Sequence, residues 1–165
     1  MKTQIRVATE KDLEAILEIV NYNILNTASI YDYEPRTLEQ QKAIMEDKIK
    51  FNFPFIVAEI DHKIVGFGTY GSFRFKEGYK FTVEHSVYID IKQQGKGIGK
   101  LILIALIDIA KKQKIHTMIA VIDSENQNSV EFHKQFGFKT VGIIKESAYK
   151  FDKWLDTVFM QLILK

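Results

Sequence analysis

The chain has 165 residues, enough for one compact domain with a hydrophobic core and too few for two of ordinary size, so residues 1–165 are predicted to form a single domain. Its formal net charge of +2 gives no electrostatic reason to expect a nucleic-acid or membrane partner. The absence of cysteine excludes disulfides, thiolate metal ligands and a cysteine nucleophile, and with no signal-peptide pattern or long apolar segment it favours a cytoplasmic protein.

The first half of the sequence predicts two helices followed by a hairpin. After a short strand at 4–7, the capping-box sequences at 9–12 and 37–40 each begin a helix, and the second helix runs to about Lys50. Period-two patterns then predict strands at 55–60 and 63–70 around a turn at 61–62. The stretch "NTASIYDYEPR" between the helices lacks a period, and we expect a loop that covers a site.

The second half begins with a strand, "FTVEHSVYI" (81–89), whose alternation places Glu84 on the polar face and His85 on the apolar face. An apolar helix to about Gln113, a strand at 116–122 and a helix over about 126–136 follow. Two further strands are expected near 138–145 and 156–164. This order, β-α-α-β-β-β-α-β-α-β-β, predicts an α/β (α+β) fold with a mixed sheet and helices on both faces.

The stretch "QQGKGIGK" (93–100) joins the strand to the apolar helix. A Walker loop is excluded because Gln94 and Leu101 stand where glycine and serine or threonine are needed, and Lys100 breaks the dinucleotide pattern. Glycines still let a phosphate approach the backbone, and the first amides of a helix are free to bind it. From spacing alone, a simple strand-to-helix turn is an equally good interpretation.

The surrounding motifs favour a ligand. Gln94-x-x-Gly97-x-Gly99 resembles the signature with which GCN5-related N-acetyltransferases (GNAT proteins) bind the pyrophosphate of acetyl-CoA, and "NQNSVEFHKQFGF" (126–138) resembles the next helix of that family. "TVEHSVYI" (82–89) and "KFDKWLDTVFMQL" (150–162) are similar to its phosphinothricin and methionine sulfone or sulfoximine acetyltransferase branch. The resemblance implies the GNAT fold: a mixed, mostly antiparallel sheet of about seven strands, splayed at the cofactor site and flanked by about four helices.

Two residues are catalytic candidates. In the resembling branch the glutamate of "VEHS" is the proposed base, which assigns that role to Glu84; the alternative is a sheet carboxylate paired with a lysine or arginine. His133 stands where many relatives carry a tyrosine thought to protonate the departing thiolate. It is expected either to act as this acid or only to form hydrogen bonds. His85 is expected to be a hydrogen-bonded core residue.

The resemblance also implies the binding residues. The acetyl-CoA candidates are Val87, Tyr88, Ile89, Gln94, Gly95, Lys96, Gly97, Ile98, Gly99, Lys100 and Asn126. Without the resemblance, Asn126 would be interpreted simply as a helix N-cap. The acceptor candidates are Arg74, Phe75, Lys76 and Tyr31, with Tyr33 and Glu34 as weaker ones; a solvated basic loop remains the alternative for 74–76. The histidines lack ligand spacing, so no metal is expected. The branch forms homodimers with acceptor sites near the interface, where Phe151 and Trp154 are candidates to pack; the alternative is that this apolar segment belongs to the core.

The leading functional hypothesis is an acetyl-CoA-dependent N-acetyltransferase for the α-amine of a small amino acid or analogue. An acetyltransferase for a polyamine, an aminoglycoside or a protein N-terminus is a second hypothesis, which the basic stretch 74–80 disfavours. A non-catalytic acyl-CoA-binding domain is the third.

Overall fold

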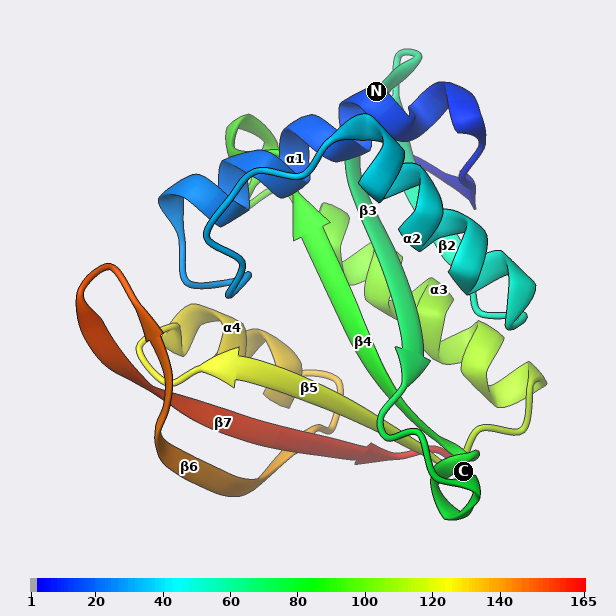
Figure 1. The fold of residues 1–165 in the computed structure, drawn as a ribbon. Coiled ribbons are helices and arrows are strands. Elements are labelled where there is room, and N and C mark those ends of the chain that lie inside the picture. The colour runs from blue at the N-terminus through cyan, green and yellow to red at the C-terminus, as the bar shows by residue number, and fades with distance from the viewer. Residues whose placement is uncertain (1–2) are drawn as a thin grey trace.

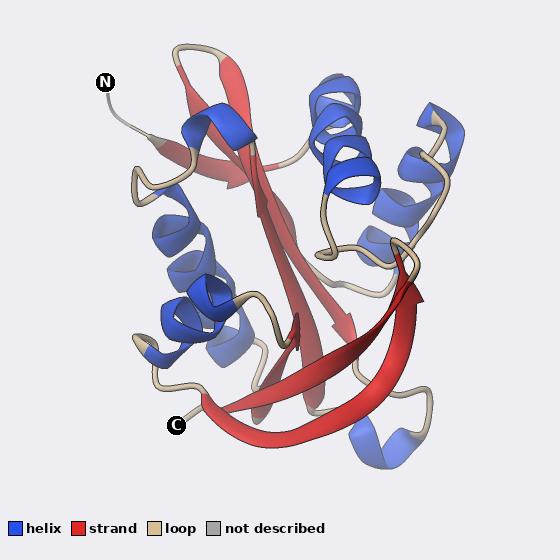
Figure 2. Ribbon diagram, turned by 90° about the vertical axis from the view of Figure 1, so that its left-hand side faces the viewer, coloured by secondary structure: helices blue, strands red, loops and turns tan. Residues whose placement is uncertain are grey.

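A computed structural model describes residues 3–165 as one seven-stranded sheet with helices on both faces (Figures 1 and 2). The strands follow the spatial order β1-β2-β3-β4-β5-β7-β6, and only the β4–β5 pair is parallel. The elements are β1 (Gln4–Val7), α1 (Leu13–Asn26), α2 (Leu38–Lys50), β2 (Phe55–Ile60), β3 (Lys63–Ser72), β4 (Thr82–Ile89), α3 (Ile98–Lys112), β5 (Thr117–Asp123), α4 (Gln127–Lys134), β6 (Lys139–Lys150) and β7 (Lys153–Ile163).

Two hydrophobic clusters divide the molecule into layers. One lies between the sheet and α3, where Ile102, Leu103 and Leu106 are fully buried. The other joins α1 to the opposite face and includes Ile16 and Met45, the latter from α2. The predicted sheet of about seven strands, with four helices on two faces, is therefore confirmed.

Local sequence signals explain most element boundaries. At the start of α2 the Thr37 hydroxyl accepts from the Gln40 amide at 3.2 Å, while the Gln40 side chain accepts from the Thr37 amide at 2.8 Å, which is the predicted capping box. Asp61 and His62 both have positive φ, as the predicted two-residue hairpin turn requires. The first capping sequence instead opens a short 3₁₀ turn, Glu10–Asp12, directly before α1.

The predicted bounds of the last two strands were wrong. β6 and β7 form a long hairpin that closes at Phe151 and Asp152, both with positive φ. The pairing is interrupted between Thr140 and Gly142 and again between Ile144 and Ala148. Such bulges break the period-two alternation, so the pattern stops before the hydrogen-bonded ladder does. None of the helices within residues 3–165 is long and apolar enough to cross a membrane.

Candidate active site

The sheet opens between β4 and β5. These strands pair only at Thr82, Val83 and Glu84; beyond Glu84, β4 continues beside β3 to Ile89, and β5 continues beside β7 to Asp123. Figure 1 shows the two strands diverging toward their carboxyl ends. The β5-facing edge of β4 from 85 to 89 therefore has no strand partner, and an extended ligand arm could pair with its backbone groups.

Glu84 lies at the last paired position before this opening. Its direct partner across β3 is Gly71, and its half-buried side chain is on the sheet face covered by α1 and α2. Burial raises the pKa of the carboxyl group, while the positive charges of Lys48 and Arg74 act against that shift. Within residues 3–165 no cation lies within 4.0 Å of the carboxylate, so the ion-paired alternative has no support in the geometry.

Lys48 of α2 belongs to this site, and the sequence did not reveal it. A Cβ atom on Gly71 would collide with the Lys48 ammonium, which therefore lies directly over the strand position opposite Glu84. Burial lowers the pKa of Lys48, and the charge of Glu84 partly opposes this shift. The available signal was Gly71 itself, because a glycine within a strand often marks a close approach by another group.

His133 of α4 lies on the other face of the sheet from Glu84. Its Nε2 atom is 3.1 Å from Nε2 of His85, and its Nδ1 atom is 2.7 Å from the carbonyl oxygen of Ser129. Both histidines are buried against Phe138. The structure therefore does not bring the two catalytic candidates together on one face, and His133 contacts the core histidine instead.

The contacts of this pair determine where its protons lie. A carbonyl oxygen only accepts, so His133 Nδ1 carries the hydrogen, and His133 Nε2 in the neutral ring accepts from His85 Nε2. His85 Nδ1 is then an unprotonated nitrogen, which fits its lack of a partner among the described residues. Burial lowers the pKa of His85 to about 3 and lowers that of His133 as well, so both rings are neutral at pH 7.

The glycine loop lies at the start of α3. Gly95 and Gly97 have φ of 75° and 78°, the left-handed conformation that favours glycine, and a Cβ atom on either would meet no atom within 4 Å. Gly97 is the N-cap of α3 and supplies no side-chain cap. The first amides of this 15-residue helix thus have no side-chain cap, and helix geometry favours an anion there.

Several predicted cofactor residues converge near this loop. A Cβ atom on Gly99 would lie 3.8 Å from the Ile89 side chain and 3.6 Å from Phe132 of α4, so the end of β4, the loop and α4 are in contact. Ile98 is buried in the core, whereas Gln94 and Lys100 are exposed.

The remaining cofactor candidates already have partners within the chain. The Lys96 ammonium donates to Gln93 Oε1 at 2.8 Å, and the Asn126 side chain accepts from the Ser129 amide at 3.1 Å as the N-cap of α4. Tyr88 packs on Phe67 at 5.4 Å between ring centroids, and Val87 is half-buried in β4.

The basic loop after β3 is exposed. The Arg74 guanidinium lies 5.2 Å from the ring centroid of Phe73, and the Phe75 side chain is 100% exposed. Lys76 precedes a short 3₁₀ turn, Glu77–Tyr79. Only Arg74 of this loop acts on the charge of Glu84.

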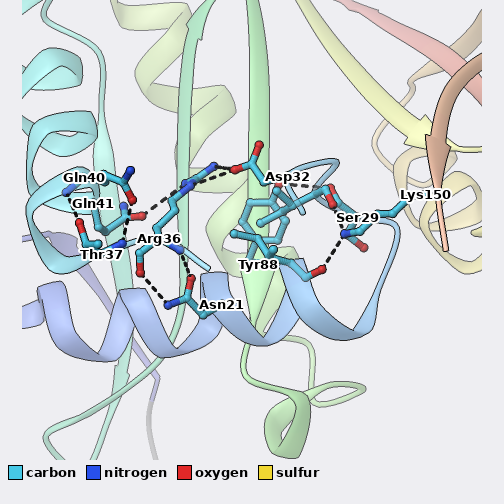
Figure 3. Close-up of polar contacts among 11 residues, drawn as sticks. Asn21, Ser29, Asp32, Arg36, Thr37, Gln40, Gln41, Tyr88 and Lys150 are labelled. Atoms are coloured by element: carbon cyan, nitrogen blue, oxygen red, sulfur yellow. Dashed lines mark hydrogen bonds and ion pairs between the residues drawn. The ribbon is translucent and has the colours of Figure 1, made fainter. Parts of the chain in front are cut away.

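The loop between α1 and α2 is held over the end of β4 by its own polar contacts (Figure 3). Asn21 exchanges two hydrogen bonds with the Arg36 backbone, at 2.8 and 3.0 Å, and the Arg36 side chain pairs with Asp32 at 2.8 Å. The Tyr88 hydroxyl is 3.5 Å from the Ser29 carbonyl oxygen. This placement is consistent with a loop that covers a site.

The tip of the β6–β7 hairpin fastens the same loop from the other side. Lys150 is buried, and its ammonium donates to the carbonyl oxygens of Ile24, Thr27 and Ile30 at 2.5 to 2.8 Å. Tyr31 and Tyr33 also reach this hairpin, through Thr157 Oγ1 at 3.5 Å and the Tyr149 carbonyl oxygen respectively. Glu34 is exposed.

A pocket of about 350 Å³ beside the hairpin tip is lined by Ile24, Leu25, Tyr33, Tyr149, Lys150, Phe151 and Asp152. It excludes Glu84 and the glycine loop. The chemistry available there is limited to aromatic rings, a lysine already bound to carbonyls and an exposed aspartate. We therefore place the candidate active site at the opening between β4 and β5. No group of three potential metal ligands occurs within residues 3–165.

Comparison with known proteins shows the family of this chain. Residues 5–159 match the family model of the acetyltransferase (GNAT) domain. The chain is 39% identical over 165 residues to the L-methionine sulfoximine/L-methionine sulfone acetyltransferase of Pseudomonas aeruginosa, covering 99% of this chain and 96% of that protein. An N-acetyltransferase from Staphylococcus aureus Mu50 superposes with a TM-score of 0.98 at 41% identity over 100% of both chains. A phosphinothricin acetyltransferase from Sinorhizobium meliloti in complex with acetyl-CoA superposes at 0.96 with 32% identity, covering 99% of this chain and 89% of that one.

Proposed function

This chain belongs to the GNAT acetyltransferase family, and from that premise we propose that it acetylates the α-amino group of a small amino acid or amino-acid analogue. It is an N-acetyltransferase that uses acetyl-CoA, and we assign the whole activity to one domain over residues 1–165. The observation that carries the proposal is the position of Glu84 at the point where β4 and β5 separate.

The chain offers acetyl-CoA two matching surfaces. The amides at the start of α3, left free by Gly95 and Gly97, suit a pyrophosphate, and the unpaired edge of β4 suits the extended pantetheine arm. When bound, acetyl-CoA supplies the acetyl group as a thioester whose thiolate is a good leaving group. We infer that the contacting residues come from 87–89, 94–100 and Asn126.

Glu84 supplies the base that the reaction needs. An amino acid arrives with a protonated amine, which cannot attack a carbonyl carbon until it loses a proton. The half-buried carboxylate accepts this proton, and burial increases its basicity by raising its pKa. The amine nitrogen then forms the amide bond while the carbon–sulfur bond breaks and its electron pair leaves on the thiolate; the second proton that the nitrogen loses balances the charge of that thiolate.

For His133 the geometry supports the hydrogen-bonding role. In the neutral ring its only hydrogen is on Nδ1, held by the Ser129 carbonyl oxygen, and Nε2 accepts from His85. Protonation of Nε2 would turn two hydrogens toward each other in a buried space. We propose that His133 fixes α4 against β4 and that the thiolate takes its proton from another source.

The acceptor class follows from chemistry shared by the relatives. L-methionine sulfoximine, L-methionine sulfone and phosphinothricin are named as substrates of proteins similar to this one, and each carries an α-amine, a carboxylate and a polar side chain. The exposed cation of Arg74 suits an anionic or polar acceptor better than a polyamine or aminoglycoside, and we propose Phe75, Lys76 and Tyr31 as further acceptor contacts.

We further propose that the protein acts as a cytoplasmic homodimer. Support comes from exposed apolar side chains on the β6–β7 hairpin: Val141, Ile143, Ile144, Phe151 and Trp154. Exposed apolar side chains gathered on one hairpin are typical of an interface.

Release of free thiol from acetyl-CoA tests the function. The wild-type protein and Glu84→Gln are incubated with L-methionine sulfone, L-phosphinothricin, spermidine and an aminoglycoside. We expect turnover on the two amino-acid analogues only, and a loss of roughly 100-fold or more in kcat for the variant at unchanged acetyl-CoA affinity, as is typical for removal of a general base. Turnover restricted to spermidine or the aminoglycoside would contradict the acceptor class, and thiol release from none of them would contradict the enzymatic function.

A further inference from the structure

Lys48 is a cation without a direct partner beside the proposed base. Within residues 3–165 its ammonium has no hydrogen bond and no carboxylate within 4.0 Å, although the side chain is half-buried. The ring centroid of Phe53 lies 6.0 Å from the ammonium. Removing an ammonium from water is costly unless a partner compensates, so a site for an anion is expected here.

The position of this cation relative to Glu84 is fixed by the sheet. Gly71 and Glu84 are directly opposite on β3 and β4, so groups above them share one face and are separated by roughly 5 Å. The Lys48 ammonium occupies the space of the side chain that Gly71 lacks. A positive and a negative charge therefore lie side by side without forming an ion pair.

This spacing matches the main chain of an amino acid. In the zwitterion, ammonium and carboxylate are attached to the same carbon, so a carboxylate lies beside Lys48 whenever the amine is placed at Glu84. We propose that Lys48 recognises the α-carboxylate of the acceptor and thereby selects α-amino acids over simple amines. This inference rests on the proposed function and names the residue that sets its substrate class.

Lys48 is better placed for this role than Arg74. Arg74 is exposed on a loop and stacks on Phe73, where water screens its charge. The Lys48 ammonium is held between α2 and the sheet, where a charge interaction with a ligand is stronger. Arg74 then remains available for the polar end of the acceptor side chain.

The test compares two acceptors that differ only in the carboxylate. These are L-methionine sulfone and 3-(methylsulfonyl)propylamine, which has the same chain with hydrogen in place of the carboxyl group. For Lys48→Met we expect KM for L-methionine sulfone to rise roughly 10- to 100-fold, as for removal of one charge-assisted hydrogen bond. KM for the amine should change less than about twofold. Lys48→Arg should restore much of the affinity, and Lys50→Met, which removes an exposed lysine of the same helix, should behave as wild type.

A second variant moves the ammonium without removing it. In Gly71→Ala the new methyl group occupies the position of the Lys48 ammonium, and a flexible side chain can yield. We expect the same preferential rise in KM for L-methionine sulfone. This variant also tests the inference if Lys48→Met does not fold, as judged by its thermal midpoint and acetyl-CoA affinity.

The outcomes separate this inference from the proposed function. Wild-type turnover of L-methionine sulfone supports the function, and equal losses on both acceptors in Lys48→Met would then overturn only the carboxylate role. If, in addition, the fall of kcat/KM at acidic pH is shifted in Lys48→Met, Lys48 acts on the ionisation of Glu84 and not on the acceptor carboxylate. Wild-type turnover of the amine but not of the amino acid would overturn both.

Discussion

Glu84 and His85 are neighbours in β4 but have opposite surroundings. Glu84 faces α2 near two cations, whereas the His85 side chain is directed to the α4 face and, among residues 3–165, bonds only to His133. One side chain keeps a charge available for a ligand, and the other is neutral because burial lowers its pKa to about 3. Alternation along a single strand thus separates the proposed chemical role of Glu84 from the structural role of His85.

The neutral histidine pair makes stability depend on pH. Folding lowers the pKa of His85 from about 6.5 to about 3, so the unfolded chain binds more protons than the folded one between these values. The resulting stability is fully present above pH 6.5 and is lost as the pH falls toward 3. Between pH 7.5 and 5.5 we expect the contribution of His85 to lower the free energy of unfolding by about 1.4 kcal/mol.

Urea unfolding at pH 7.5, 6.5 and 5.5 measures this effect in the wild type and in His85→Gln, which retains a donor for His133. The variant should lose less stability over this range, because one titrating group is gone. His62→Gln is the control, since it also removes one histidine and the His62 side chain is 99% exposed. Equal pH slopes in wild type and His85→Gln would contradict the argument.

At the scale of elements, we expect the start of α3 to control cofactor binding. Gly97→Val places a β-branched side chain in a left-handed conformation, at φ 78°, and directs it into the space where we expect the pyrophosphate. We expect stability to fall by about 1–2 kcal/mol and acetyl-CoA affinity to fall at least roughly tenfold. Calorimetric titration of the folded variant with acetyl-CoA measures the second effect.

Gly78→Val is the matched control, because Gly78 also has open space around it but lacks a positive φ. It should bind acetyl-CoA as wild type does. Unchanged acetyl-CoA affinity in Gly97→Val would mean that the loop is only a strand-to-helix turn.

Local sequence signals predict the order of the elements better than their exact bounds. Capping at Thr37 and alternation around Glu84 are local signals, and they predicted the element order and the side of the strand that Glu84 occupies. The full length of β6 was not predictable, since Glu146 has positive φ within a stretch where alternation fails. Lys48 was missed because its meaning comes from its position against Gly71, two elements away, and α2 otherwise has the composition of a solvated helix.

At the scale of the whole molecule, the β6–β7 hairpin connects the two halves of the fold. The buried ammonium of Lys150 caps the carboxyl end of α1 by donating to carbonyl oxygens in and beyond the last turn of that helix. The helix dipole also favours a cation at this end. Three donated hydrogen bonds compensate the buried charge. The hairpin thereby positions the loop over the end of β4, although β6 forms an edge of the sheet and β4 lies at its centre.

The outer surface of this hairpin determines the expected assembly. β6 is the last strand of the sheet, and its exposed side chains include Val141, Ile143 and Ile144, each more than half exposed. A long apolar edge strand attracts another chain unless it is covered.

For the wild type, sedimentation should therefore give twice the mass of the 19.1 kDa chain. Ile143→Lys introduces a charge at this edge and should give the monomer mass, because a dimer could then form only by burying an unpaired ammonium. Phe51→Lys is the control, since it replaces a similarly exposed apolar side chain at the end of α2 and leaves the hairpin intact. A wild-type monomer, or a dimer that persists in Ile143→Lys and dissociates in Phe51→Lys, would contradict assembly through the hairpin.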